Sequence, residues 1–222
     1  SRGTAAVVAG ERVVLLTDRD GALWQLERDS GALIPLLPAH QDTVCENEPH
    51  VQPLHLEDSG RLVYGRSGAP VSEGTLAGVS RTLRTLIAEE PRVACRATYA
   101  RGPADLEAVW IEEPREGLDS PLSRVWWRTA MGAAWIPHDT PGGLNLQLAF
   151  VGSRLVVPRV EAVSLWAYTE GTRAPRLCSV RSLGGPTRKV VASTPGQVVA
   201  TTGREGQDGN YKEVDVTWLA VE

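Results

Sequence analysis

Short valine- and leucine-rich runs alternate with turn sequences along the whole chain. In the first repeat the runs cover residues 5–9, 12–17, 22–26 and 33–37. Asp-Gly and Ser-Gly pairs separate several of them, and glycine supplies the positive φ that tight hairpin turns need. Only residues 76–90 have apolar residues at helical spacing, and Gly78 and the lack of a capping residue favour two short strands there. The pattern therefore predicts an all-β chain.

The apolar runs recur in five units, and four of these units carry a tryptophan on a later run. The spacing from Arg12 to Trp24 equals the spacing from Arg154 to Trp166. A repeat of ~40–45 residues with four short strands in each unit is typical of a β-propeller. The predicted blades cover residues 5–38, 50–91, 92–140, 143–185 and 187–222.

Packing between these units explains why the repeat is needed. A unit of four short strands cannot bury both faces of its sheet alone, but it can do so between two neighbours around an axis. A tryptophan on the third strand is expected to fill the space to the next blade and to bury ~200 Å2 there. We therefore predict one domain over residues 1–222, a five-bladed β-propeller. A partial propeller completed by association and a β-sandwich are the alternatives.

The segment of residues 13–33 resembles one blade of the PQQ-like and WD40-like propeller repeats. It runs strand, Asp-Gly turn, strand, Ser-Gly turn, strand. The tryptophan that follows a Thr-Gly turn in quinoprotein blades is absent after Gly31, and WD dipeptides are absent too. The resemblance thus implies a propeller without a quinone, and no other cofactor is expected. Residues 17–24 also resemble half of the Asp-box of sialidases, with Arg19 in the place of the motif's aspartate.

Composition narrows the class of protein further. Hydrophobic residues make up 42% and charged residues 23%, which is typical of a globular domain and not of a disordered chain. The net charge of −4 argues against nucleic acid as a partner. Arginine outnumbers lysine by 21 to two, but the arginines are dispersed, which favours the codon bias of a GC-rich genome over a binding patch.

The chain contains no apolar run of about 18 residues and no visible signal peptide. We therefore expect no insertion into a membrane, and a soluble protein that is either cytoplasmic or exported after removal of a signal. The three cysteines are widely spaced and form no CxxC motif, so neither a zinc site nor a redox pair is expected. Cys95 and Cys178 both lie in predicted strands, and the sequence leaves open whether they pair.

The densest group of polar residues lies in a predicted linker between the first two units. Its candidate binding residues are His40, Asp42, Glu46, Glu48 and His50. Their spacings match no known metal-ligand motif, so no metal is expected. The plain interpretation is a solvated loop between blades. If the segment has a function, we expect it to bind a protein partner, because propellers concentrate function in the connections on one face.

A second polar group, Glu112, Glu113 and Arg115, falls in a predicted exposed loop over residues 111–121. Paired carboxylates serve glycoside hydrolysis, and propeller glycosidases aim one carboxylate per blade at the axis. That arrangement would need acidic residues such as Asp105 or Glu107 on the innermost strands, and the other units have Val, Leu or Arg there. The segment is therefore interpreted as an exposed hairpin loop, and its residues are a second candidate contact for a protein partner.

The pair Trp126-Trp127 is the third candidate. Adjacent residues of a strand face opposite sides of the sheet, so one ring is expected in the core and Trp127 is a possible exposed contact.

Motifs of catalysis are absent from the sequence, including GxSxG, the P-loop and HExxH. The sequence therefore favours a non-enzymatic module that binds or scaffolds other proteins within a larger assembly. A propeller that binds or acts on carbohydrate is the alternative, because the chain has seven tryptophans and the partial Asp-box.

Overall fold

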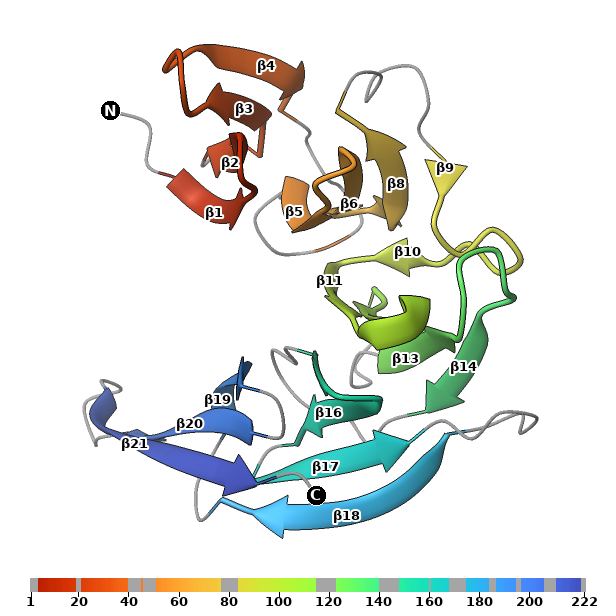
Figure 1. The fold of residues 1–222 in the computed structure, drawn as a ribbon, viewed down its shortest axis with the longest axis vertical. Coiled ribbons are helices and arrows are strands. Elements are labelled where there is room, and N and C mark those ends of the chain that lie inside the picture. The colour runs from red at the N-terminus through yellow and green to blue at the C-terminus, as the bar shows by residue number, and fades with distance from the viewer. Residues whose placement is uncertain are drawn as a thin grey trace. The chain divides into compact units, whose positions relative to one another are not determined.

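Antiparallel β-strands make up nearly all of the regular structure (Figure 1). The computed structural model describes residues 4–18, 21–39, 45, 51–76, 84–114, 123–139, 148–159, 161–167, 175–183, 187–194, 197–205 and 211–220. The chain divides into two compact units. One comprises Ser1–Ala97 with Ile111–Leu122, and the other Thr98–Trp110 with Ser123–Glu222.

The first sheet contains four strands that follow one another in chain order. They are β1 (Thr4–Ala9), β2 (Val13–Asp18), β3 (Leu23–Glu27) and β4 (Leu33–Leu37). Each begins and ends within one residue of the predicted strand. Gly21 and Gly31 adopt φ values of 78° and 68° in the connecting turns, which confirms the role expected of the Asp-Gly and Ser-Gly pairs.

The second sheet has the order β5-β6-β8-β9. Its strands are β5 (Val51–Leu56), β6 (Arg61–Arg66), β8 (Ser72–Thr75) and β9 (Arg84–Thr85), and β7 (Ala69–Pro70) pairs with β10 (Val93–Ala94) in a separate ladder. The segment with helical spacing contributes β9, and its described part contains no helix. Residues 77–83 lie outside the described residues.

Three more sheets follow in the same manner. The third contains β11 (Arg96–Arg101), β12 (Glu107–Glu112), β13 (Ser123–Arg128) and β14 (Ile136–Asp139). The fourth contains β15 (Ala149–Val151), β16 (Arg154–Pro158), β17 (Ala162–Ala167) and β18 (Arg176–Ser182). The fifth has three strands, β19 (Thr187–Thr194), β20 (Gln197–Glu205) and β21 (Tyr211–Ala220).

The fourth sheet is buried on both faces, as a blade between two neighbours must be. Leu155 and Val157 of β16 pack in one cluster with Trp127 and Trp166. Val156, between them in sequence, packs in another cluster with residues of β17 and β20. Burial of both faces explains why the strand reads as a continuous apolar run instead of an alternating one.

The tryptophans differ in burial. Trp127 is 1% exposed and Trp126 is also buried, so the expectation that Trp127 is exposed is wrong. The reason is that both faces of β13 are covered. Trp166 is buried as expected of a residue that packs between blades, whereas Trp218 on β21 is 62% exposed. In the described part of the chain no strand lies beyond β21 in its sheet.

A disulfide joins Cys45 to Cys95, with 5.5 Å between the Cα atoms. Cys178 is an exposed free thiol on β18. The pair of Cys95 with Cys178 that the sequence left open is therefore excluded. Pairing depends on which Cα atoms approach within about 7 Å in the fold, which sequence spacing does not reveal.

Candidate functional site

A pocket of about 420 Å3 lies beside β3 and β4, and we call it the β4 pocket. It is lined by Asp18, Ala22, Trp24, Pro35, Leu36, Leu37, Pro38 and Ala39. Apart from Asp18 every lining residue is apolar or aromatic. Such a lining is typical of a site that receives an apolar group and orients it with few polar contacts.

A β-bulge in β4 shapes this pocket. Leu23 pairs with Leu37 and Trp24 pairs with Pro35, so Leu36 is an extra residue between the two pairs. A bulge bends its strand and re-aims the side chains beside it. Pro35 has no N–H to donate, which fits the outermost strand of a sheet.

The Asp18 carboxylate fixes the ring of Trp24 at the pocket. One carboxylate oxygen, Oδ1, accepts a hydrogen bond from the backbone N–H of Ala22 at 3.0 Å. The other, Oδ2, accepts one from Trp24 Nε1 at 3.2 Å. The Gly21 N–H closes the turn by donating to the Asp18 carbonyl at 3.1 Å. The turn that resembles half an Asp-box therefore positions a partly exposed indole.

Exposed apolar residues continue from the pocket along β4. Leu33 is 54% exposed and Ile34 is 39% exposed. Because β4 is the last strand of its sheet, its outer edge has no partner strand among the described residues. The sequence did not predict these residues as a site, because the apolar run 33–37 has the pattern of an ordinary strand of the repeat. One feature of the sequence does indicate the site: the run 33–37 is the outermost strand of its unit, and it is more apolar than a strand edge that faces solvent normally is.

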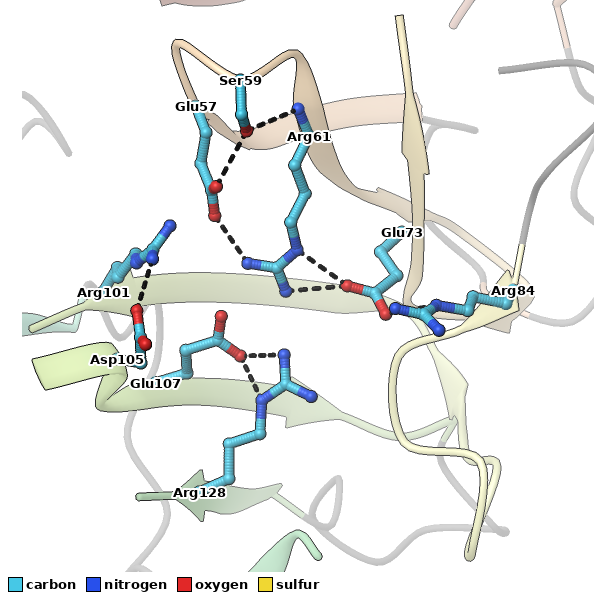
Figure 2. Close-up of polar contacts among 9 residues, drawn as sticks. All are labelled: Glu57, Ser59, Arg61, Glu73, Arg84, Arg101, Asp105, Glu107 and Arg128. Atoms are coloured by element: carbon cyan, nitrogen blue, oxygen red, sulfur yellow. Dashed lines mark hydrogen bonds and ion pairs between the residues drawn. The ribbon is translucent and has the colours of Figure 1, made fainter. Parts of the chain in front are cut away.

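Charged side chains form a paired network in the first unit (Figure 2). Arg61, at the start of β6, donates from Nη1 to Glu57 at 2.7 Å and from Nε to Glu73 at 2.9 Å. Arg84 approaches the other oxygen of Glu73 at 2.6 Å. Glu73 is buried, so two guanidinium groups compensate the one carboxylate that burial would otherwise destabilise.

The second unit contains a buried pair of the same kind (Figure 2). Arg128 donates from Nε to one oxygen of Glu107, and its Nη2 forms an ion pair with the same oxygen; the Glu107 side chain is 0% exposed. Arg101 pairs with Asp105 across a short turn at 2.7 Å. Asp105 and Glu107 are the acidic positions considered for glycosidase chemistry, and arginine neutralises both. Each of these two carboxylates is therefore held in an ion pair with an arginine.

The second polar group of the sequence is partly a strand. Glu112 is buried at the end of β12 and its carbonyl accepts from the Cys95 N–H at 2.7 Å, so its assignment to an exposed loop is wrong. Antiparallel pairing extends to this residue and carries it out of solvent. Glu113 is partly buried and lies 3.6 Å from Arg92. Arg115 lies outside the described residues.

The predicted partner-binding segment lies almost wholly outside the part of the chain that the structure describes. Its candidate residues His40, Asp42, Glu46, Glu48 and His50 all fall there. Two described points frame the segment: Ala39 lines the β4 pocket, and buried Cys45 is bonded to Cys95.

Metal-ligand clusters and membrane-spanning helices are both absent from the described residues. No three His, Cys, Asp or Glu side chains among them gather as a metal site would require. No helix in the same part of the chain has the length and apolar character to cross a membrane.

Comparison with known proteins shows which fold the chain adopts. No family model and no curated protein matches the chain. Among solved structures it is similar to BamB from Moraxella catarrhalis, with a TM-score of 0.59, 13% identity, and coverage of 98% of this chain and 59% of that one. It is also similar to YCF48 bound to D1 peptide, with a TM-score of 0.55, 13% identity, and coverage of 97% of this chain and 66% of that one. A third similar structure is the complex of KlAtg21 with the coiled-coil of AgAtg16. Its TM-score is 0.64 at 9% identity, and the match covers 95% of this chain and 64% of that one.

These proteins are β-propellers. The chain has a β-propeller fold. This confirms the all-β propeller of PQQ-like or WD40-like type that the sequence predicted. The propeller chain spans less than two thirds of the length of these three structures. Closure of five blades into a ring stays a prediction.

Proposed function

We propose that this propeller is a non-catalytic protein-interaction module that docks a partner at the β4 pocket. The observation that carries the proposal is the exposed apolar strand beside the pocket, with Leu33 54% and Ile34 39% exposed. An apolar edge strand left in solvent is prone to aggregation, and proteins normally cover or charge it. A partner that covers β4 removes that liability.

The geometry supports docking of an extended segment along β4. Its backbone would pair with the free edge of the strand, and one apolar side chain would enter the pocket against Trp24. A rigid indole at the centre of a contact commonly contributes a large share of binding energy, and Asp18 already holds this ring in place. Two similar propellers are bound to a peptide and to a coiled-coil, which supports this class of partner.

Cross-linking of this chain to its partner, followed by affinity capture from the native source, tests the proposal. Ile34→Glu places a charge on the apolar strand and is expected to abolish capture of the partner that the wild-type chain retains. Met131→Glu is the matched control, because Met131 is 50% exposed in a turn of the other unit. Circular dichroism must show that both variants are folded. A partner captured equally by wild type and Ile34→Glu contradicts docking on β4.

Carbohydrate binding is the second candidate, and the partly buried Trp24 fixed by a carboxylate is the observation that favours it. An indole face can stack on a sugar ring while an acidic group accepts hydrogen bonds from its hydroxyls. Binding on a glycan array that is lost in Trp24→Ala would support this candidate. An array without binding would reject it and leave the protein-interaction proposal intact.

A further inference from the structure

A second pocket, of about 470 Å3, lies on β18 in the other unit, and we call it the β18 pocket. It is lined by Arg154, Leu165, Arg176, Leu177, Cys178, Ser179, Arg181 and Ala220. Three of these residues are arginines and none is acidic. Its character is therefore opposite to that of the β4 pocket.

Strand register places the three arginines on one face of the fourth sheet. Arg154 of β16 pairs with Ala167 of β17, which in turn pairs with Arg176 of β18. Residues that pair directly across strands project to the same face, so Arg154 and Arg176 flank Ala167 about 10 Å apart. Arg181 pairs with Val163 of β17. Alternate residues of a strand share a face, so Val163, Leu165 and Ala167 project to the same side, and Arg181 projects there with them.

The positive charge of the pocket is uncompensated in the part of the chain that the structure describes. Neither Arg154 nor Arg176 nor Arg181 forms an ion pair with a described carboxylate. By contrast, Arg61 and Arg128 lie within hydrogen-bond distance of carboxylates. Three cations around one hollow repel each other, and the hollow concentrates a field that attracts anions.

The bulge beside the pocket does not depend on arginine, because the first sheet forms the same bulge without it. In the fourth sheet Leu165 pairs with Ser179 and Trp166 with Leu177, so Cys178 is an extra residue, as Leu36 is in the first sheet. In both sheets the extra residue of the outer strand therefore lies opposite the tryptophan of the third strand and the residue that precedes it. In the first sheet its surroundings are apolar, and in the fourth they are cationic.

We propose that the β18 pocket binds an oxyanion that carries two or more negative charges, either a phosphate ester or a polycarboxylate. Planar guanidinium groups bind phosphate and carboxylate oxygens through paired charge-assisted hydrogen bonds. The Ser179 hydroxyl supplies one more donor, and Leu177 and Ala220 provide an apolar contact for the rest of the ligand. The site is independent of the docking proposed at β4.

Cys178 provides a direct test, since it lines the pocket and is the one cysteine of the three that is not in the disulfide. The rate of its alkylation by neutral iodoacetamide is measured with and without pyrophosphate or citrate at low salt. Bound anion is expected to slow alkylation several-fold. Protection by pyrophosphate alone assigns a phosphate ligand, and protection by citrate alone assigns a carboxylate ligand. No protection by either anion overturns the proposal.

Calorimetric titration with the protecting anion tests the arginines. Arg176→Ala and Arg181→Ala are each expected to weaken binding by about tenfold, the effect of losing one charge-assisted hydrogen bond. Arg28→Ala is the matched control, because Arg28 is an exposed arginine in the turn between β3 and β4 and lies outside the pocket. Added salt is expected to weaken wild-type binding. Unchanged affinity in both pocket variants contradicts the site.

Discussion

At the scale of single residues, the pair of Glu107 and Arg128 shows why a buried charge needs its partner. The Glu107 side chain is fully buried, and the guanidinium of Arg128 also stacks over Trp135 at 4.7 Å. Removing one partner leaves the other charge in a medium of low dielectric, which costs more than the pair gains.

Arg128→Met is therefore expected to lower the free energy of unfolding by about 3–5 kcal/mol. Urea denaturation followed by tryptophan fluorescence measures the change. The double variant Glu107→Gln with Arg128→Met should recover a large part of the loss, because no unpaired charge remains. Arg101→Met is the control: its pair with Asp105 is half-exposed and is worth about 0–1 kcal/mol. Equal losses in the two single variants would contradict the argument.

Tyr64 gives a prediction about pH. Burial raises the pKa of its phenol, and a hydrogen bond with Ser72 and the charge of Arg66 offset part of the rise. The unfolded chain ionises this group near pH 10, so it loses the proton before the folded chain does. The stabilising contribution of Tyr64 is present below about pH 10 and is lost as pH rises through the raised folded pKa.

Urea unfolding across the alkaline range measures this effect. The wild-type protein should lose stability more steeply above about pH 10 than Tyr64→Phe, which has no phenol to ionise. All other alkaline titrations are common to the two proteins. Parallel curves would show that the phenol is no harder to ionise in the folded chain than in the unfolded chain.

At the scale of elements, the close approach of β15 to the turn before β12 leaves no room for a side chain at Gly102. A Cβ added there would lie 2.7 Å from Cγ of Phe150. The Phe150 ring meets Trp127 edge-on, with 6.0 Å between the centroids, so it cannot shift without disturbing the core.

Gly102→Ala is expected to destabilise the protein by about 1–3 kcal/mol, the usual cost of overpacking. Thermal and urea unfolding measure it. Gly65→Ala is the matched control, since a Cβ there meets its nearest atoms at 3.6 Å, an ordinary contact. A variant at Gly102 as stable as the wild type would mean that Phe150 moves freely.

The elements also show what the sequence can and cannot predict. Strands β1 to β4 were predictable within one residue because a glycine lies in each of the turns that separate them. Nothing local marks the bulges at Leu36 and Cys178, since a bulge depends on which residues pair across strands. Both candidate pockets depend on these bulges, so the sequence located neither of them. Trp127 was misplaced because alternation assumes a sheet with one exposed face.

At the scale of the whole molecule, one covalent cross-link ties distant parts of the chain. Cys45 and Cys95 are separated by 50 residues. Closing a loop of that size restricts the unfolded chain and stabilises the fold by about 2–4 kcal/mol. Disulfides persist in oxidising compartments, so the pairing predicts that the protein works in one.

Cys45→Ser with Cys95→Ser is expected to lower the melting temperature, and reductant should lower that of the wild type equally. Cys178→Ser is the control and should leave stability nearly unchanged, because its thiol is exposed. Peptide mapping without reduction should recover Cys45 linked to Cys95. Recovery of Cys45 and Cys95 as free thiols in a protein purified without reductant would contradict the pairing.

The same cross-link also decides how the protein survives cleavage. All strands of the second sheet lie between Cys45 and Cys95 in the chain, so they form a covalently closed cassette. A protease that cuts once inside this cassette opens the backbone without releasing a fragment. The nicked protein should migrate as a single species on a gel without reductant and separate into two fragments when reductant is added. The second sheet can therefore lose the continuity of its backbone while its strands stay tethered at a high local concentration.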